Sequence, residues 1–372
     1  MPFVKNSAPV ATPSRSPRSG LAALALLPAA LLAGCDTVVL NPSGDIAAQQ
    51  GQLIVISTLL MLLIIVPVIV LTLLFAWRYR ASNTKATYSP DWDHSTQLEL
   101  VIWAAPLLII IALGALTWIT THTLDPYRPL SRIDENRPLD ANHKPMVVEV
   151  VAMDWKWLFI YPEHGIATVN ELAAPVDTPI QFRITSTSVM NSFFIPALGG
   201  QIYAMPGMET KLHAVINKAG SYQGISANYS GAGFSGMHFK FHGMSQADFE
   251  KWVQKAKADG SALSREHYQQ LEKPSEREPV RLYASVEEGL YHAILNRCVE
   301  RSKMCMDQMM AIDARGGMGH AGIEGLATRD SRGQPPERSY VAALCTEENP
   351  TGSPVQLVSR DGLGALSPTA LP

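Results

Sequence analysis

Two long uncharged segments near the N-terminus constrain this chain more than any other feature. Leu53–Trp77 and Leu100–Ile119 contain no Asp, Glu, Lys or Arg. About 20 apolar residues suffice for a helix to cross a hydrocarbon core of about 30 Å. Pro67 and Pro106 lie inside the segments, and membrane helices tolerate proline better than soluble helices do. The sequence therefore predicts two transmembrane helices, over about 53–77 and 100–119, and excludes a simple soluble protein.

The charges around these segments predict how they cross the membrane. The loop between them carries Arg78, Arg80 and Lys85, whereas residues 36–52 contain no Lys or Arg. Positively charged short loops remain on the cytoplasmic side. We therefore expect the loop in the cytoplasm, and both the N-terminal end and the whole chain after the second helix in the periplasm.

Residues 1–34 have the features of a signal peptide. Three cations precede Leu21–Leu32, an apolar segment too short to span a bilayer. Residues 32–35, Leu-Ala-Gly-Cys, resemble a bacterial lipobox, which implies cleavage before Cys35 and lipidation of its sulfur. Asp36 then resembles an inner-membrane retention signal. The alternative is an ordinary secretory cleavage site followed by a chance cysteine.

Overall composition excludes two classes of protein. The chain has 372 residues, a net charge of −3 and no run of basic residues. A nucleic-acid-binding protein would show clustered Lys and Arg. Four cysteines are too few for a small scaffold held together by disulfides.

After the second helix the pattern changes from helical to strand-like. Short segments rich in β-branched and aromatic residues alternate with Gly, Pro and Asn, which predicts a β-sandwich over residues 123–243. The strand candidates are Met146–Tyr161, Pro179–Thr185, Ser192–Ile195, Thr210–Ile216, Gly220–Ser226 and Gly236–His242. The predicted fold class is therefore a membrane-anchored α+β protein, with a transmembrane hairpin in residues 35–122 ahead of the sandwich.

A helical extension is expected over residues 244–310. Ser245 can cap a helix through about Lys257, and two more helices are predicted at Ser264–Leu271 and Ser285–Arg301. Residues 311–372 are rich in Gly, Pro and polar groups, so we expect a mostly irregular tail.

Several motifs in the predicted sandwich resemble subunit II of the haem–copper terminal oxidases, in the quinol-oxidising, cytochrome bo-type branch. They are Asp154–Trp157, Val189–Pro196, Gly200–Met208, Tyr222–Gly231 and Gly233–Met237. The resemblance implies a cupredoxin-like sandwich in a proton-pumping ubiquinol oxidase of the bacterial inner membrane. It also implies that haems, copper and ubiquinol bind to a partner, subunit I, and that this chain has no catalytic residue or cofactor of its own.

The copper-containing branch of this family holds a dinuclear copper centre, for which the pattern is a His followed later by Cys-x3-Cys-x3-His-x2-Met. In this chain Asn191 stands at the first His, Ile225 and Tyr229 at the two Cys, and Phe234 near the second His. Only Met237 is retained. Low-valent copper is held by soft thiolates, which these residues do not provide. We therefore predict a sandwich without copper.

Two further groups of residues in this sequence are of types that can bind metal ions. His238 and His242 are four residues apart on one predicted strand, about 13 Å apart, so we expect surface residues rather than a metal pair. Cys298, Cys305 and Cys345 occur in a Met-rich segment. They indicate either a periplasmic site for a soft metal or, as we favour, one disulfide and a free thiol.

The pairing of these cysteines depends on the predicted helix. On one continuous helix Cys298 and Cys305 would stand about 10 Å apart, too far for a disulfide. Either the helix breaks near Ser302 or Cys345 is the partner. We favour a disulfide between Cys305 and Cys345.

Glu99 lies at the cytoplasmic end of the second predicted helix. A carboxylate there can simply lie among lipid headgroups and favour the helix N-terminus electrostatically. The alternative is a group at the entrance of a proton path, because ionisable residues at membrane depth are often functional. Glu99 also matches the position that the resembling family uses for proton uptake, and both interpretations stay open.

The segment Trp155–Trp157 resembles the electron-accepting aromatic region of copper-containing relatives. Without copper, we expect these residues in the sandwich core and at a subunit interface.

Two rival functions remain: a cytochrome c oxidase subunit II with unrecognised copper ligands, and a stand-alone lipoprotein that binds a partner.

Overall fold

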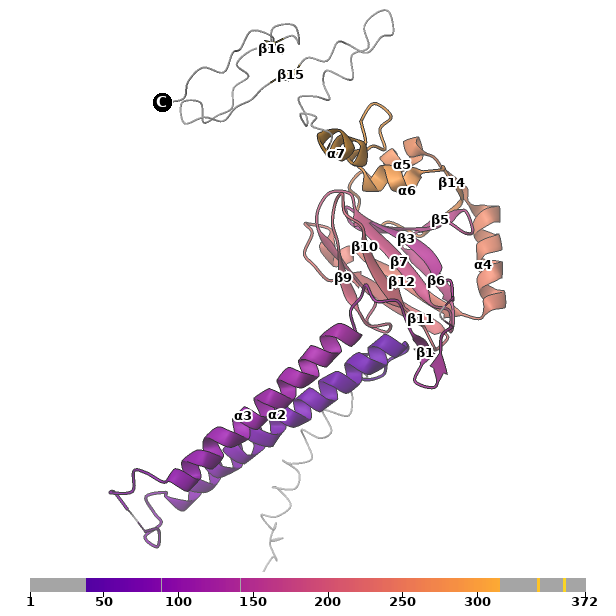
Figure 1. Ribbon diagram of the computed structural model, residues 1–372. Helices are drawn as coiled ribbons and strands as arrows, with labels where there is room; N and C mark the ends of the chain where they lie inside the picture. The colour runs from indigo at the N-terminus through magenta and orange to yellow at the C-terminus, as the bar shows by residue number, and fades with distance from the viewer. Residues whose placement is uncertain (1–37, 88, 141, 315–339, 342–356, 359–372) are drawn as a thin grey trace, which may run out of the picture.

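The computed structural model describes residues 38–314, apart from residues 88 and 141, and the short strands β15 (Tyr340–Val341) and β16 (Leu357–Val358). Cys35 and Cys345 lie outside the described residues, as does most of the predicted tail. The described chain forms a helical hairpin, then a two-layer β-sandwich, then short helices (Figure 1). This order confirms the predicted fold class.

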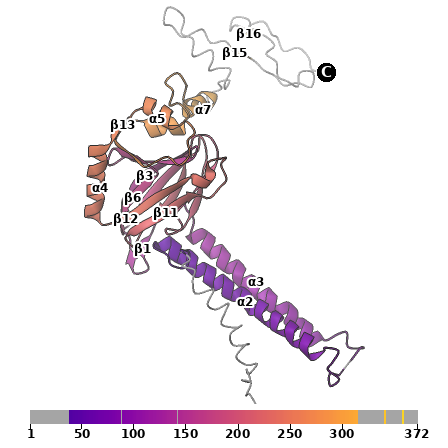
Figure 2. The same cartoon turned by 180° about the vertical axis from the view of Figure 1, so that it is seen from behind.

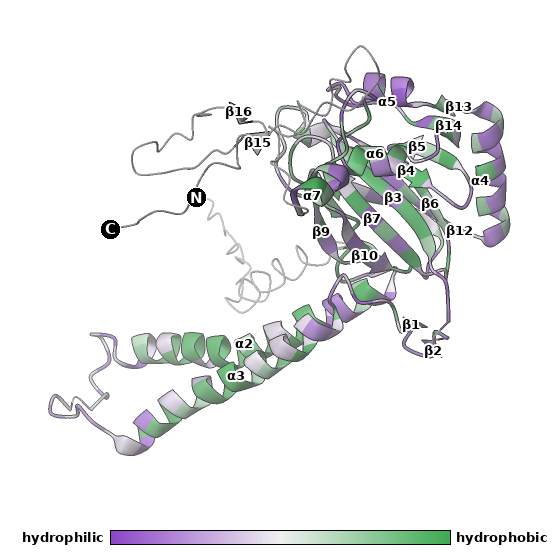
Figure 3. Cartoon of the chain, turned by 45° about the horizontal axis from the view of Figure 1, so that its top comes forward, coloured by the Kyte–Doolittle hydropathy of each residue, from purple (hydrophilic) through white to green (hydrophobic). Residues whose placement is uncertain are grey.

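The helical hairpin consists of α2 (Asp45–Arg78) and α3 (Thr96–Thr123). Each helix contains one predicted span and extends beyond it at both ends. Both are long and apolar enough to cross a membrane, and nearly all of their large apolar side chains are exposed. Figure 3 shows that hydrophobic residues predominate along the ribbon of both helices. Such a surface requires lipid or a partner protein to cover it.

The N-terminal end of α2 is attached to the sandwich. Asp45 forms an ion pair of 2.9 Å with Arg132, and the Ala47 N–H donates a hydrogen bond of 3.1 Å to the Leu198 carbonyl. Gly199 has a φ of +74°, and a Cβ at this position would lie 2.7 Å from the Ala47 Cα. Only glycine allows the strand turn to approach the helix so closely.

The sandwich packs a seven-stranded sheet against a five-stranded one. The strand orders are β10-β7-β3-β4-β5-β14-β13 and β6-β12-β11-β8-β9. A separate small hairpin, β1 (Arg132–Asp134) with β2 (Arg137–Pro138), lies near the membrane helices (Figure 1). The strands that follow the connector are β3 (Met146–Met153), β4 (Lys156–Tyr161), β5 (Ile166–Val169), β6 (Glu171–Pro175), β7 (Ile180–Ser186), β8 (Asn191–Phe194), β9 (Gln201–Ala204), β10 (Thr210–Ala214), β11 (Gly220–Ser226) and β12 (His238–Met244).

Aromatic side chains fill the space between the two sheets. Side chains alternate between the faces of a strand, so every second residue enters this layer. The Trp157 ring lies 5.4 Å from the Phe193 ring and 5.7 Å from the Phe239 ring, and all three side chains are fully buried. The expectation that Trp157 belongs to the core is confirmed.

The C-terminal segment covers the outer face of the larger sheet (Figure 2). Its elements are α4 (Gln246–Asp259), β13 (Ser261–Leu263), α5 (Arg265–Leu271), β14 (Arg281–Val286), α6 (Leu290–Leu295) and α7 (Met306–Ala314). Tyr268, Tyr291 and Cys298 pack there against Val151 and Leu158 of the sheet. Because both faces are covered, almost every side chain of β3 and β4 is buried.

Two of the three predicted C-terminal helices are confirmed. Ser245 caps α4 by accepting a hydrogen bond of 3.2 Å from the Asp248 N–H, and Ser264 caps α5 by accepting one of 3.3 Å from the His267 N–H. These caps satisfy amides that have no partner within the helix.

The predicted helix over Ser285–Arg301 is wrong. Ser285 is the penultimate residue of strand β14, which pairs with β5 and extends the larger sheet. Gly289 and Arg297 both have positive φ, 73° and 56°, so only the six residues of α6 between them are helical. The free edge of β5 therefore outweighs the local helical pattern.

Candidate functional site

The positions that correspond to copper ligands lie on two adjacent strands and the loop after them. Asn191 begins β8, Ile225 is the penultimate residue of β11, and Tyr229 follows in the loop. Phe234 begins the short helix η1 (Phe234–Gly236), and Met237 comes directly after it. β8 and β11 pair side by side, so the fold brings these positions to one end of the sandwich.

The polar groups at this end bind each other. The fully buried Asn191 side chain donates a hydrogen bond of 3.1 Å to the Val189 carbonyl and accepts one of 3.1 Å from the Ser226 hydroxyl. Ile225 precedes Ser226 on the same strand, so their side chains lie on opposite faces of the sheet. The amide is therefore satisfied by protein groups.

The remaining positions are apolar or aromatic. Tyr229 is 75% exposed, and its ring lies 5.6 Å from the Phe234 ring. Met237 is 1% exposed and packs into the core between the sheets. An amide, an alkyl group, a phenol, a phenyl ring and a buried thioether do not fit a dinuclear copper centre, which needs thiolates and imidazoles. In the described part of the chain no group of three or more His, Cys, Asp or Glu could hold a metal ion.

Trp155 holds the loop that carries these positions. Its indole N–H donates a hydrogen bond of 3.0 Å to the Ser230 carbonyl. A Cβ at Gly233 would lie 2.5 Å from the indole, and Gly231 has a φ of +115°. The loop thus lies flat against a half-buried aromatic ring, and glycine is required for this approach.

The two histidines of β12 have different surroundings. His238 is exposed, whereas His242 is half-buried with its Nε2 3.7 Å from a Glu171 carboxylate oxygen. The same carboxylate accepts a hydrogen bond of 3.0 Å from the Trp252 indole. Both histidines are therefore accounted for as residues of the strand's outer surface.

At the other end of the molecule, Glu99 lies in the first turn of α3 and contacts a histidine that sequence reasoning missed. The Nδ1 atom of His94 lies 2.7 Å from a Glu99 carboxylate oxygen, and its Nε2 lies 3.2 Å from the Thr96 hydroxyl. His94 directly precedes the N-cap residue Ser95. Apolar residues directly before the cap often pack against the fourth helical residue, and His94 and Glu99 occupy these two positions. This spacing could have revealed the pair.

A cluster of charged side chains lies where the C-terminal segment packs on the outer face of the larger sheet. The Arg183 guanidinium contacts Glu149 at 3.3 Å and Glu209 at 2.7 Å, and lies over the Tyr291 ring at 5.4 Å. Burial raises the pKa of Glu149 to about 7, while Arg183 opposes the shift and Glu209 adds to it. The cluster joins the sheet to the C-terminal segment.

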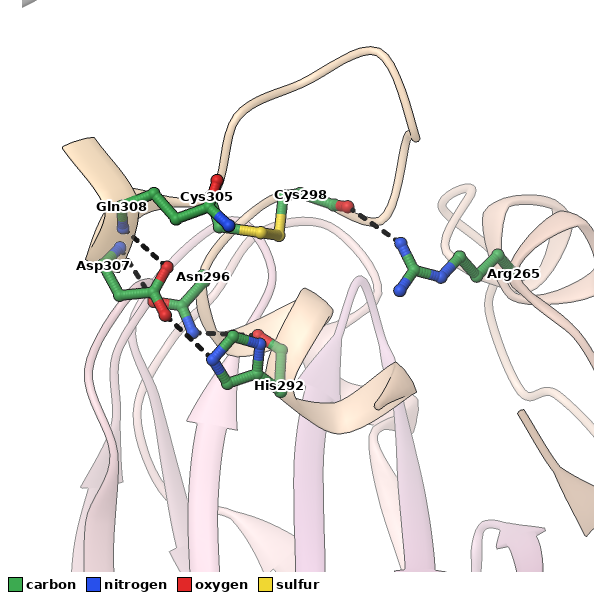
Figure 4. The surroundings of a disulfide bond; sticks show 7 residues. All are labelled: Arg265, His292, Asn296, Cys298, Cys305, Asp307 and Gln308. Atoms are coloured by element: carbon green, nitrogen blue, oxygen red, sulfur yellow. Dashed lines mark hydrogen bonds and ion pairs between the residues drawn. A yellow bond between two sulfur atoms is a disulfide. The ribbon is translucent and has the colours of Figure 1, made fainter. Parts of the chain in front are cut away.

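The disulfide links Cys298 with Cys305, with 4.8 Å between the Cα atoms (Figure 4). The favoured pairing of Cys305 with Cys345 is therefore wrong. Its premise fails because the chain reverses after α6: the Cys298 N–H donates a hydrogen bond to the Ala293 carbonyl, and the Met306 N–H donates one to the Asn296 carbonyl. The alternative of an interrupted helix is the correct one, although α6 already ends at Leu295, upstream of Cys298, rather than near Ser302.

Comparisons with known proteins decide the family. A model of the cytochrome c oxidase subunit II periplasmic domain matches residues 163–243, and a model of the oxidase aromatic-rich motif matches residues 257–302. Cytochrome bo(3) ubiquinol oxidase subunit 2 of Pseudomonas putida is 54% identical over 267 residues, which cover 72% of this chain and 82% of that protein. The chain belongs to the ubiquinol oxidase subunit II family. Ubiquinol oxidase subunit 2 of Acetobacter aceti is 53% identical, covering 72% of this chain and 84% of that protein.

Among solved structures, the periplasmic domain of cytochrome oxidase subunit II of Bradyrhizobium japonicum is similar to this chain. It shares 22% sequence identity, with a TM-score of 0.31, and covers 32% of this chain and 99% of that domain. Membership of the ubiquinol oxidase subunit II family leaves the two rival functions with less support: a copper-containing cytochrome c oxidase subunit and a stand-alone lipoprotein.

Proposed function

We propose that this chain is subunit II of a proton-pumping ubiquinol oxidase, in which electrons pass from ubiquinol to oxygen within subunit I. The observation that carries the proposal is the 54% identity to a ubiquinol oxidase subunit along 82% of that protein. Haems, copper and the ubiquinol site then belong to subunit I. The unsuitable donor set at Asn191, Ile225, Tyr229 and Phe234 supports this assignment of cofactors. Ubiquinol arrives within the membrane, so no periplasmic electron acceptor is required.

The part played by this chain is architectural. The exposed apolar side chains of α2 and α3 are suited to a large membrane partner and to lipid. The attachment of α2 to the sandwich through Asp45, Ala47 and Gly199 fixes the periplasmic domain relative to the hairpin. We infer that the sandwich covers the periplasmic face of subunit I.

Native purification tests this assignment against the solitary lipoprotein. Solubilised with a mild detergent, the chain should elute together with a haem-containing polypeptide. Elution of the intact chain alone, while an oxidase of the same membrane elutes elsewhere, would contradict the proposal.

The proposed location is the bacterial inner membrane, with Cys35 as a lipid-modified N-terminus. The resemblance of residues 32–35 to a lipobox supports this modification. Intact mass spectrometry of the purified chain should show a start at Cys35 and the added mass of acyl chains. An unmodified N-terminus at Cys35 would leave a two-span protein without a lipid anchor.

Glu99 is proposed to lie at the entrance of a proton path to subunit I. Its position in the first turn of α3, on the side of the membrane opposite to the sandwich, supports this role. Glu99→Ala should slow ubiquinol-driven oxygen uptake by roughly tenfold or more, because a positioned proton carrier is lost. Haem content should stay normal. Wild-type turnover in this variant would end the proton-path proposal.

A further inference from the structure

The carboxylate of Glu149 lies on the face of the larger sheet that the C-terminal segment covers. Its neighbours in β3, Val148 and Val150, belong to the core between the two sheets. Side chains alternate between the faces of a strand, so Glu149 lies on the outer face. Arg183 stands directly beside it on the paired strand β7 and contacts its carboxylate at 3.3 Å.

Helix α6 provides the cover above this pair. The Tyr291 ring lies 5.4 Å from the Arg183 guanidinium. Ile294, one turn later, belongs to the same buried cluster as Ile160, which is the cross-strand neighbour of Glu149 on β4. As a result Glu149 is only 9% exposed. Glutamate is rarely buried to this extent.

Several elements place titratable or charged side chains around Glu149. β7 contributes Arg183 and the loop before β10 contributes Glu209, which contacts Arg183 at 2.7 Å. On β10, Lys211 stands beside Arg183 in the sheet, and His213 follows two residues later on the same face. The partners on α6 and β4 are Tyr291 and Ile160, and His292 of α6 is exposed and paired with Asp307.

Glu149 is the group in this set that titrates near neutral pH. The hydrogen bond with Glu209 raises the pKa of Arg183, so the guanidinium stays charged. Burial raises the pKa of Tyr291, so the phenol stays neutral. Burial lowers the pKa of His213, whose Nδ1 lies 3.1 Å from the Pro126 carbonyl. Burial also raises the pKa of Glu149, to about 7.

Movement of α6 away from the sheet would relieve the burial of Glu149 without removing its partner. Arg183 would remain beside it, because both residues lie on paired strands of the sheet. An ionised carboxylate therefore gains water and keeps its cation, whereas a neutral carboxyl gains much less. The covered state thus favours the protonated form and the uncovered state favours the ionised form.

We infer that residues 290–314 form a pH-dependent latch, which is closed over the sheet while Glu149 is protonated and is released when this carboxyl gives its proton to water. The pKa of Glu149 in the closed state lies above its ordinary value of 4.5. The proton therefore stabilises the closed latch fully below pH 4.5, and this stabilisation is lost as the pH rises through about 7. The disulfide between Cys298 and Cys305 lies wholly within the latch and does not tie it to the sheet. The inference is independent of the proposed role in ubiquinol oxidation.

Amide hydrogen exchange of the purified complex tests the latch. Protection is measured at pH 5.5 and pH 8.5 and corrected for the intrinsic effect of pH on amide exchange. The reporting peptide contains Ala293 and Cys298, whose N–H groups donate to the Gly289 and Ala293 carbonyls. A helix of six residues is unstable without its packing, so release of α6 exposes these amides. A peptide from β4 (Lys156–Tyr161) serves as the reference within the sheet.

We expect the corrected protection of the latch to fall by about 10- to 30-fold from pH 5.5 to pH 8.5, as the two pKa values of Glu149 require. Protection of β4 should stay constant. Glu149→Gln, which cannot ionise, should keep the latch equally protected at both pH values. Glu163→Gln is the matched control, because Glu163 is an exposed glutamate in the turn after β4, and it should behave as wild type.

Three results would overturn the latch. The first is equal protection of the wild-type latch at both pH values. The second is the same fall in Glu149→Gln, because another group would then control the release. The third is a parallel fall in β4, which would mean that the whole domain opens rather than the latch alone. If Glu149→Gln failed to assemble, Glu149→Ala would be measured in its place, since it also lacks the titrating group.

Discussion

The end of the sandwich and the cytoplasmic end of α3 differ in what their side chains can do. At the sandwich end, Asn191 and Met237 are buried and engaged with protein groups. At the cytoplasmic end, His94 and Glu99 are accessible to water and titratable. The first region keeps the sandwich fold with side chains that do not fit a copper centre, whereas the second carries the carboxylate for which we propose a role in proton entry. Substitutions in the periplasmic part should therefore change stability, and those near Glu99 should change turnover.

The largest effect on stability is expected in the aromatic core. Trp157→Ala removes a fully buried side chain that contacts Phe193 and Phe239, which should lower the free energy of unfolding by about 3–5 kcal/mol. Thermal melts of the purified complex and its yield report this loss. Turnover per assembled complex should stay at the wild-type value, and a specific loss of turnover would break the comparison.

Removal of the disulfide should have the next largest effect. The double variant Cys298→Ser, Cys305→Ser frees a loop of only a few residues, which should cost about 2–3 kcal/mol. The loss should appear as earlier unfolding of the complex, with normal oxygen uptake per haem. A peptide map in which Cys305 is linked to Cys345 would contradict the structural assignment.

Glu149 should make the periplasmic domain sensitive to pH. Burial raises its pKa from 4.5 to about 7 in the folded protein, so the folded state holds this proton more tightly than the unfolded state does. The stabilisation is complete below pH 4.5 and is lost as the pH rises to about 7. Glu149→Gln should reduce the difference in stability between pH 5 and pH 8 by about 1–3 kcal/mol. Melts at both values measure it, and an unchanged difference would refute the assignment.

The smallest effect is expected at a former ligand position. Tyr229 is 75% exposed and its ring lies 5.6 Å from the Phe234 ring, so Tyr229→Ala should change stability by less than about 0.5 kcal/mol. Oxygen uptake with ubiquinol should also be unchanged. A marked loss of turnover would show that this loop takes part in the reaction and would break the comparison.

Much of the fold could be predicted because it depends on local patterns. The uncharged segments predict α2 and α3, alternating residues predict most strands of the sandwich, and Ser245 and Ser264 predict two helix starts. The C-terminal segment could not be predicted in the same way. Strand β14 forms because β5 offers a free edge more than a hundred residues earlier, and no local signal at Ser285 reveals that partner.

The candidate sites were predictable to different degrees. The sequence alone predicts that Asn191 and Tyr229 stand where copper-containing relatives have a His and a Cys, because this comparison needs only residue types. The disulfide was missed because its prediction assumed one continuous helix, which Arg297 interrupts with its positive φ. The contact of His94 with Glu99 was within reach of the sequence, since the two residues stand at positions that commonly meet at a helix start.

The most direct test of the central claim is oxygen uptake by the purified complex with two electron donors. If the sandwich lacks copper and electrons enter through subunit I, the complex should consume oxygen with ubiquinol and not with reduced cytochrome c. Rapid oxygen uptake with reduced cytochrome c, accompanied by copper bound to this chain, would contradict the account.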